Sequence, residues 1–178
     1  AKGVQKMPSL DELAQQIRAC PLCRLCKART LAVPGEGPED ARLMFVGEGP
    51  GFHEDQQGRP FVGAAGQFLE TLLASIKLTR QDVYITNVVK CRPPNNRDPQ
   101  PDELAACRPY LDQQIALIRP QMIVTLGRFS MQIAFMGVSI SQVHGIPKKV
   151  GDIVICPSSI PQRRCIRCVS RRPSKRIS

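Results

Sequence analysis

Four apolar runs along the chain are continuous rather than alternating, at residues 42–46, 83–89, 122–126 and 152–155. Such runs are typical of strands that are buried on both faces of a sheet. In the intervening segments apolar residues recur at helical spacing, at residues 63–77, 102–118 and 127–136. This order predicts an α/β fold, a three-layer α/β/α domain with a central four-stranded parallel sheet.

A further helix is predicted close to the first residues of the chain. Ser9 is a suitable N-cap, and Glu12 three residues later completes a capping box. The apolar residues that follow share one helical face, at Leu10, Leu13 and Ile17. The helix is expected to end at Cys20, because Pro21 comes next.

The same pattern indicates where a binding site would lie. Parallel sheets bind ligands at the carboxyl ends of their strands. Three features are placed there: the glycine-rich loop Gly47–Gly51, Asn87 near the end of the second strand, and whatever follows Ile155.

Composition agrees with one compact domain, since the 178 residues are 42% hydrophobic and 22% charged. The net charge of +10 points to a polyanionic partner, but seven basic residues and no acidic one lie between Arg163 and Ser178. Without them 18 basic and 15 acidic residues remain, a net charge of +3. We therefore expect a folded domain over residues 1–155 and a poorly ordered basic tail over residues 156–178.

The cellular compartment of the protein determines whether its cysteines are expected to be reduced. No apolar segment approaches the length of a membrane span, and the N-terminus lacks the core of a signal peptide. An intracellular protein is expected, with no membrane partner. Thiols stay reduced inside the cell, so that clustered cysteines more often hold metal than form disulfides.

Two pairs of cysteines could form one metal site. Cys20 and Cys23 make a CxxC pair, Cys91 follows the second strand, and Cys107 lies in the next predicted helix. Four thiolates can bind zinc or an iron–sulfur cluster, and spacing alone does not separate the two. Cys26 is expected to be a spectator. A competing arrangement joins the first CxxC pair to a second in the tail, Cys165 and Cys168, as in a zinc ribbon.

The glycine-rich loop Gly47–Gly51 is neither a dinucleotide fingerprint nor a phosphate loop, because Pro50 interrupts it and no Gly-Lys-Ser/Thr follows. It can bring backbone N–H groups close to a small planar ligand, although a plain tight turn is the simpler reading. Phe61 lies between glycines in a segment that is too polar to be core. Asn87 interrupts an apolar strand, and a buried amide there is either satisfied internally or available to a ligand.

Together these features resemble the family 4 uracil-DNA glycosylases, the iron–sulfur type found in bacteria and archaea. The resemblance extends from about Ser9 to Ile155 and rests on the CxxC pair, GEGPG with Glu54-Asp55, GRPFVGAAGQ, ITNVVKCRPPNNR and Cys107. It implies the uracil-DNA glycosylase superfamily fold and hydrolysis of the N-glycosidic bond of deoxyuridine in DNA, which leaves an abasic site. It further implies a monomer with a structural [4Fe–4S] cluster on Cys20, Cys23, Cys91 and Cys107.

The resemblance also implies roles for individual side chains around a flipped-out uracil, in a pocket formed by Gly47, Glu48, Gly49, Phe61 and Asn87. Phe61 would stack on the base, and Asn87 would pair with O4 and N3–H, which excludes cytosine. Glu54 would fill the space of a thymine methyl, and Glu48 would orient the attacking water. No lysine in these motifs is placed as a Schiff-base nucleophile, so a monofunctional enzyme is expected. Three basic residues beside the cluster loop are expected to contact DNA: Lys90, Arg92 and Arg97.

One family motif is missing. Members carry a His-Pro dipeptide after the fourth strand, whose histidine donates to uracil O2, whereas this chain has no histidine after His144. His144 itself lies before that strand and is interpreted as a loop residue. One legal set of codons for residues 155–166, translated in the neighbouring frame, gives Leu-Pro-Leu-Phe-His-Pro-Ala-Ala-Ala-Leu-His, which is the missing motif. The tail from about Cys156 is therefore interpreted as a frameshift product, by mutation or sequencing error, and loss of the O2 donor is expected to impair activity.

Two other classes of function are consistent with parts of the sequence. A non-catalytic nucleic-acid-binding zinc protein would use Cys20, Cys23, Cys165 and Cys168 with the basic tail. A small-molecule hydrolase would use the glycine-rich loop and would show no salt-dependent affinity for DNA.

Overall fold

The structure is a computed structural model, and it describes residues 7–158. Its strands are β1 (Leu43–Gly47), β2 (Tyr84–Asn87), β3 (Met122–Leu126), β4 (Lys148–Val150) and β5 (Ile153–Ser158). Its α-helices are α1 (Leu10–Ala19), α2 (Phe52–Gln57), α3 (Ala64–Ser75), α4 (Pro101–Ile118), α5 (Arg128–Met131) and α6 (Ile140–Val143). Three 3-10 turns complete the list, η1 (Arg24–Lys27), η2 (Arg80–Asp82) and η3 (Pro94–Asn96).

The strands form one sheet in the order β2-β1-β3-β5-β4. The four predicted strands are parallel to one another, and the three-layer α/β/α prediction is confirmed. A fifth strand, β4, pairs antiparallel with β5 at the edge. Sequence pattern missed β4 because its three residues are all exposed, so that it carries no buried apolar run.

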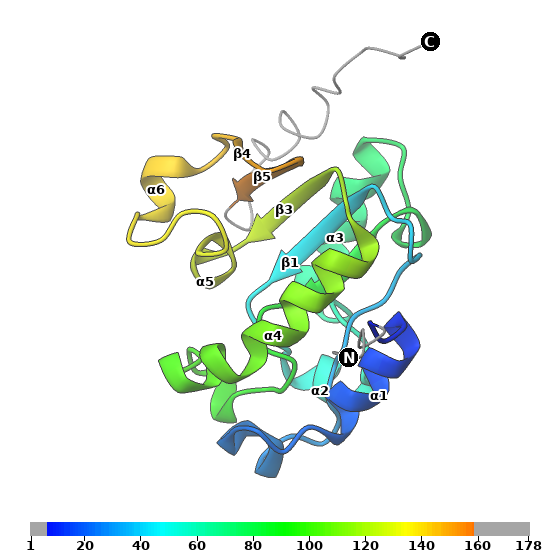
Figure 1. Cartoon of the computed structure of the whole chain (residues 1–178), viewed down its shortest axis with the longest axis vertical. Coiled ribbons are helices and arrows are strands. Elements are labelled where there is room, and N and C mark those ends of the chain that lie inside the picture. Colours follow the sequence, from blue (N-terminus) through cyan, green and yellow to red (C-terminus); the bar gives the residue numbers. More distant parts are fainter. Residues whose placement is uncertain (1–6, 159–178) are drawn as a thin grey trace, which may run out of the picture.

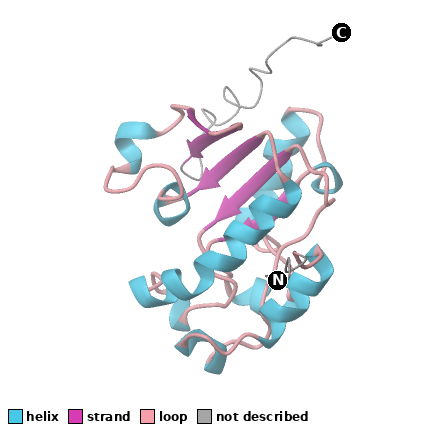
Figure 2. Cartoon of the chain, viewed as in Figure 1, coloured by secondary structure: helices cyan, strands magenta, loops and turns pink. Residues whose placement is uncertain are grey.

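Helices cover both faces of the sheet, with α4 in front of it and α3 behind it in the view of Figure 1, and the same layers are coloured by type in Figure 2. Successive residues of β1 point to opposite faces. Leu43 and Phe45 pack in the core on the α3 side, whereas Met44 and Val46 pack in the core on the α4 side. The continuous apolar run is therefore explained by burial on both faces.

The first helix begins as the capping box predicts. Ser9 Oγ accepts a hydrogen bond from the Glu12 amide at 3.2 Å, and Glu12 Oε2 accepts one from the Ser9 amide at 2.7 Å. Leu13 and Ile17 are buried against a third cluster of core residues, which includes Cys91 and Cys107. Packing of α1 thus brings the first CxxC pair toward the other two cysteines.

Two helical segments differ from the sequence-based expectation. The helix expected over residues 127–136 is only four residues long, because beyond Met131 the amides of Gln132 and Ile133 bond to carbonyls three residues back, as in a tighter turn. Conversely, α2 opens directly after the glycine-rich loop, where no helix was predicted.

The end of the sheet lies beyond the domain boundary expected at residue 155. β5 continues to Ser158, and Cys156 and Ser158 are buried. Residues 159–178, which include Cys165, Cys168 and the basic residues of the tail, lie outside the described residues. Within the described residues, no helix combines the length and the apolar character needed to cross a membrane.

Candidate functional site

A cleft of about 490 Å³ opens at the carboxyl ends of β1 and β2. Six residues singled out from the sequence line it: Glu48, Gly49, Glu54, Phe61, Asn87 and Arg97. The two strands are in register there, with Gly47 paired to Asn87. The cleft therefore lies where parallel sheets generally bind ligands.

Gly47 lies beneath the cleft and determines how closely its walls approach. A Cβ atom at this position would lie 2.4 Å from Asn87 Oδ1 and 2.5 Å from Phe61 Cζ. Real Cβ atoms do not tolerate such contacts, so only glycine lets the aromatic ring and the amide lie together over the strand end.

The Asn87 side chain is 2% exposed at residue level and lines the cleft. Its backbone carbonyl accepts a hydrogen bond from Lys90 Nζ at 2.6 Å. Within residues 7–158 its side-chain amide has no hydrogen-bond partner. An amide in such a place costs free energy unless a ligand or water bonds to it, so the geometry favours a group available for binding over a structural one.

Phe61 differs from the sequence-based expectation, because it is part of the core. It is 8% exposed and packs with Leu69, Leu73 and the β1 residue Phe45. The interpretation of its segment as too polar to be core was wrong for this one residue. Its φ of 53° lies in the left-handed region, which a phenylalanine adopts only when its surroundings enforce it.

Arg80 in η2 supplies that constraint. Its Nη1 donates to the Phe61 carbonyl at 2.8 Å, and its Nη2 donates to the Pro60 carbonyl at 2.6 Å. The same guanidinium forms an ion pair with Glu36 at 2.6 Å. Burial works against ionisation of Glu36, but hydrogen bonds from Arg59 and Arg80 outweigh it and hold the pKa of this carboxyl below its usual value.

Sequence reasoning missed both Arg80 and Glu36. They lie 44 positions apart, and neither belongs to a motif that predicts contact with the Phe61 loop. The only local signal was that each lies next to a predicted strand or glycine-rich turn, which is too common to identify a pair.

The Glu54 carboxylate holds the loop on its other side. Its Oε1 accepts hydrogen bonds from the amides of Val62 and Gly63, both at 2.9 Å, and its Oε2 accepts one from the Gly51 amide at 3.1 Å. Three backbone donors fix the position of this carboxylate within the cleft wall. It is therefore a rigid part of the wall rather than a mobile side chain.

Glu48 extends from the end of β1 toward the first turn of α5. Its Oε1 accepts a hydrogen bond from the Phe129 amide at 3.3 Å. Gly127 makes this approach possible, since a Cβ atom there would lie 2.3 Å from the same oxygen. The carboxylate is partly buried and lines the cleft, where it can accept a hydrogen bond from a bound water.

Lys90 is buried and does not reach the surface, so the expectation that it contacts DNA was wrong. It is 1% exposed, and its Nζ donates to Thr86 Oγ1, Asn87 O and Gln114 Oε1 at 2.6–2.7 Å. Burial lowers the pKa of Lys90 to about 7. Its position after a strand in a basic run suggested the surface, but the strand carries it beneath Asn87 instead.

Of the other two basic residues, Arg97 lines the cleft and Arg92 contacts two residues of its lining, Phe52 and Asn96. The Arg97 guanidinium is engaged by Glu103, with two hydrogen bonds at 2.7 and 2.9 Å. Arg92 lies over the ring of Phe52, with its Cζ 5.2 Å from the ring centroid. The two arginines thus differ, because one is paired with a carboxylate and the other is placed on an aromatic ring.

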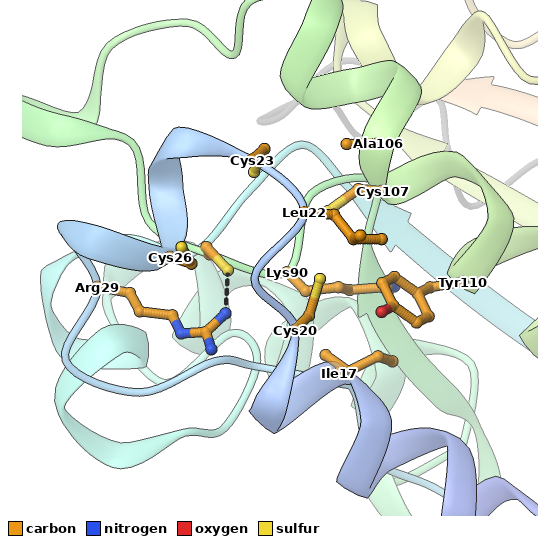
Figure 3. A pocket seen from close by; sticks show the side chains of 11 residues that line it. Ile17, Cys20, Leu22, Cys23, Cys26, Arg29, Lys90, Ala106, Cys107 and Tyr110 are labelled. Carbon is orange, nitrogen blue, oxygen red and sulfur yellow. Dashed lines mark hydrogen bonds between the residues drawn. The ribbon is translucent and has the colours of Figure 1, made fainter.

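A separate small cavity collects five cysteines from four segments of the chain. Cys20 follows α1 directly, Cys23 precedes η1, and Cys26 lies within η1. Cys91 follows β2, and Cys107 lies in α4. Figure 3 shows the labelled cysteine side chains surrounding this space together with Arg29, Lys90 and Tyr110. The four cysteines predicted from the sequence are therefore brought together, and Cys26 lies beside them.

Cys91 and Cys107 are buried in the cavity, whereas Cys20, Cys23 and Cys26 are partly exposed. Burial raises the pKa of Cys91 to about 11 and also raises that of Cys107. Arg29 donates from Nη1 to the Cys91 sulfur at 3.0 Å, which is the dashed contact in Figure 3. Such an arrangement suits thiolates that share their charge with a bound metal group, since free thiolates would be costly here.

No group of three or more His, Cys, Asp or Glu side chains in the described part of the chain is arranged to hold a single metal ion. The sulfur atoms around this cavity are donors that either a zinc ion or an iron–sulfur cluster can use. The second CxxC pair of the zinc-ribbon alternative lies outside the described residues.

Comparison with known proteins agrees with this geometry. The family model described as "Uracil DNA glycosylase superfamily" matches residues 34–174. The chain is 54% identical over 146 residues to a type-4 uracil-DNA glycosylase of Sulfurisphaera tokodaii, a match that covers 80% of this chain and 66% of the relative. It is 57% identical over 129 residues to that of Archaeoglobus fulgidus, covering 72% and 65%, respectively.

A third relative is covered more fully. The type-4 uracil-DNA glycosylase of Thermotoga maritima is 49% identical over 140 residues, which is 78% of this chain and 73% of the relative. The chain thus spans slightly less than two thirds of the first two relatives and 73% of the third. On the strength of these matches and of the superfamily fold, the chain belongs to the type-4 uracil-DNA glycosylase family.

Proposed function

We propose that this chain is a DNA-repair glycosylase that hydrolyses the N-glycosidic bond of deoxyuridine in DNA, releasing uracil and leaving an abasic site. The single observation that carries the proposal is the amide of Asn87, which lines the cleft without a hydrogen-bond partner in the described residues, beside Phe61 and over Gly47. A planar base that both stacks and pairs is the ligand these groups fit.

Recognition begins with a base that has left the DNA stack, at a cost of a few kcal/mol. Stacking on Phe61 recovers about 1–3 kcal/mol of it. The Asn87 amide donates to O4 and accepts from N3–H of uracil, whereas cytosine presents the opposite pattern and would leave buried groups unpaired. The Glu54 carboxylate, fixed by three backbone amides, is a wall rigid enough to exclude the methyl group of thymine.

Bond cleavage gives an oxocarbenium-like sugar and an anionic uracil, so donors directed at the base oxygens lower the barrier. Glu48 orients the water that attacks the sugar, from its position between the glycine-rich loop and α5. No covalent enzyme intermediate is needed. Lys90 is engaged by three acceptors beneath the cleft, which supports a monofunctional enzyme.

Four cysteines would hold a [4Fe–4S] cluster: Cys20, Cys23, Cys91 and Cys107. The cluster would supply structure rather than redox chemistry. It would tie α1 and η1 to the segment after β2 and to α4, and so hold the Asn87 strand end in place. The partner is uracil-containing DNA, bound by a monomer in the cytoplasm.

A uracil-release assay on single- and double-stranded oligonucleotides tests the proposal. Two proteins are compared: the present chain, and a chain whose residues from 156 onward are replaced by the neighbouring-frame sequence with its His-Pro motif. We expect excision by the second and a rate about 10²–10³-fold lower for the first, because one oxyanion donor is missing. Absence of uracil release from the restored chain would refute the proposed function. Sequencing the source DNA across codons 150–165 separately decides the frameshift hypothesis.

A further inference from the structure

We propose that Phe52 and Arg92 form a stacking platform for the unpaired nucleotide that flanks the target uracil, so that this chain favours single-stranded DNA. The inference deepens the proposed function and rests on it, because Phe52 lines the same cleft.

Phe52 is the one aromatic residue among the exposed large apolar side chains of residues 7–158. It is the first residue of α2, it is 52% exposed, and it lines the cleft together with its neighbour His53. The rings of Phe52 and His53 meet edge to face, with centroids 5.5 Å apart and an interplanar angle of 80°. Edge-to-face packing holds the phenylalanine ring in one orientation, while the residue as a whole remains 52% exposed.

Arg92 adds a positive charge to this ring. Its guanidinium carbon lies 5.2 Å from the Phe52 centroid, and its Nε donates to Asn96 Oδ1 at 2.7 Å, which holds the side chain in place. Among residues 7–158 no ion pair involves Arg92, whereas Arg97 and Arg128 are each paired with a carboxylate. The charge of the guanidinium is therefore not neutralised by a carboxylate and can attract a phosphate. The neighbouring aromatic ring can stack on a base.

The partner that fits an exposed ring beside an unpaired cation is a single-stranded nucleotide. Bases within a duplex are stacked on each other, so their faces are covered, and only an unpaired base can lay its face on a protein ring. The acidic residues of the cleft wall disfavour a phosphate inside the cleft. Arg92 lies next to the cleft, in contact with Phe52 and Asn96 of its lining. The flipped uracil would occupy the cleft, and the adjoining nucleotide would rest on Phe52.

Equilibrium binding tests the platform independently of catalysis. The full chain is titrated, by fluorescence anisotropy, into an oligonucleotide that carries a 2′-fluorinated deoxyuridine, which resists hydrolysis. Phe52→Ala should weaken binding to the single strand about 5- to 150-fold, the range of one base–aromatic stack. Phe52→Trp should retain affinity and Phe52→Leu should lose most of it, because stacking needs a ring.

Substrates with abasic nucleotides on both sides of the uracil give the decisive comparison. The wild-type protein should bind these substrates more weakly by the same factor by which Phe52→Ala weakens binding to the ordinary single strand. On these substrates Phe52→Ala should bind as well as the wild type. Arg92→Gln should reduce the slope of log K against log salt by about 0.7, the value for one contact on a single strand. Met136→Ala, which removes an exposed apolar side chain outside the cleft, is the matched control and should bind like wild type.

The outcomes separate the two proposals. Unchanged affinity of Phe52→Ala, or a loss that persists undiminished on the flanking-abasic substrate, would overturn the platform and leave the glycosylase proposal standing. Failure of the wild-type chain to bind any uracil-containing oligonucleotide would overturn both. Circular dichroism and thermal unfolding of each variant confirm that the fold is intact, as expected for changes at an exposed ring.

Discussion

At the scale of single residues, the cleft depends on contacts that no other side chain could make. Gly47 lets Phe61 and Asn87 meet, since any Cβ there would collide with both. Phe61 in turn adopts a left-handed backbone because Arg80 holds its carbonyl. The chemistry of the site is therefore assembled from one absent side chain, one strained residue and one arginine.

Asn87→Ala is expected to lower kcat/KM for uracil excision about 10²–10³-fold in the chain with the restored His-Pro motif, because the group that pairs with the base is lost. The thermal midpoint should stay close to wild type, since this amide forms no hydrogen bond within the described part of the chain. Gln67→Ala, an exposed amide on α3, is the control and should leave both quantities unchanged. A variant that excises uracil normally would remove Asn87 from the site.

The Glu36–Arg80 ion pair predicts a pH dependence. The pKa of Glu36 is lowered in the folded chain, so the pair stabilises the fold above the unfolded pKa, and this contribution is lost as pH falls through the folded pKa. Urea unfolding of wild type and Glu36→Gln between about pH 3 and 7 should therefore show a difference in free energy that is full above about pH 5 and shrinks in acid.

Exposed Glu39 offers the matched control, because it forms no ion pair with any described residue. The free energy of unfolding of Glu39→Gln should differ from that of the wild type by the same amount at every pH. A Glu36→Gln deficit that stays constant down to pH 3 would contradict the assignment.

At the scale of elements, the loop that carries Phe61 is held from three sides. α2 supplies Glu54, η2 supplies Arg80, and α3 begins directly after the loop. The first turn of α3 approaches the loop so closely that a Cβ atom on Gly66 would lie 1.8 Å from the Phe61 carbonyl oxygen. The position of the aromatic ring is therefore a property of helix packing rather than of the loop alone.

Gly66→Ala reverses the usual sign of a substitution in a helix. Propensity alone would stabilise the helix by about 1 kcal/mol. Overpacking against the Phe61 carbonyl should instead destabilise the protein by about 1–3 kcal/mol and weaken uracil binding. Chemical denaturation and oligonucleotide titration measure the two effects.

Ala74→Gly, at an exposed position of the same helix, should follow propensity and lose up to about 1 kcal/mol without affecting binding. A stabilised Gly66→Ala protein with normal affinity would show that the helix does not position the ring.

At the scale of the whole molecule, the cysteine cavity joins the N-terminal segments to the sheet. Arg24 in η1 lies 2.9 Å from Asp102 of α4 and adds a second link across the same boundary. The cavity and the cleft communicate through the segment from Asn87 to Cys91, since Lys90 between them bonds to the Asn87 carbonyl. A cluster bound by the cysteines would therefore stabilise the strand end that carries Asn87.

Cys107→Ser should abolish the broad visible absorption of the purified protein, remove its iron and sulfide, and lower its thermal midpoint, because one cluster ligand is lost. Cys26→Ser is the matched control from the same cavity and should keep all three properties. Iron analysis and visible absorbance show which of the two variants has lost the cluster. A colourless Cys26→Ser protein, or a wild-type protein that contains zinc and no iron, would contradict the ligand assignment.

The architecture could be predicted because it follows from patterns that are local in the chain. Four continuous apolar runs and the helices between them determined a parallel sheet covered on both faces, and the Ser9 capping box determined where α1 begins. β4 and the short α5 escaped prediction, since an exposed strand has no apolar run and apolar spacing does not show where a helix breaks into turns.

The sequence by itself thus determined the fold, the family and the cysteines that share one cavity. These features could be predicted because the spacing of apolar residues and the order of the motifs can be seen directly in the chain. Only the tertiary structure decided that Lys90 is buried beneath Asn87 and that Arg92 lies over the ring of Phe52. It also decided that Arg80, paired with Glu36, donates a hydrogen bond to the Phe61 carbonyl. The physical reason is that these contacts join residues brought together by sheet pairing and helix packing, and their energy depends on distances that no one-dimensional pattern contains.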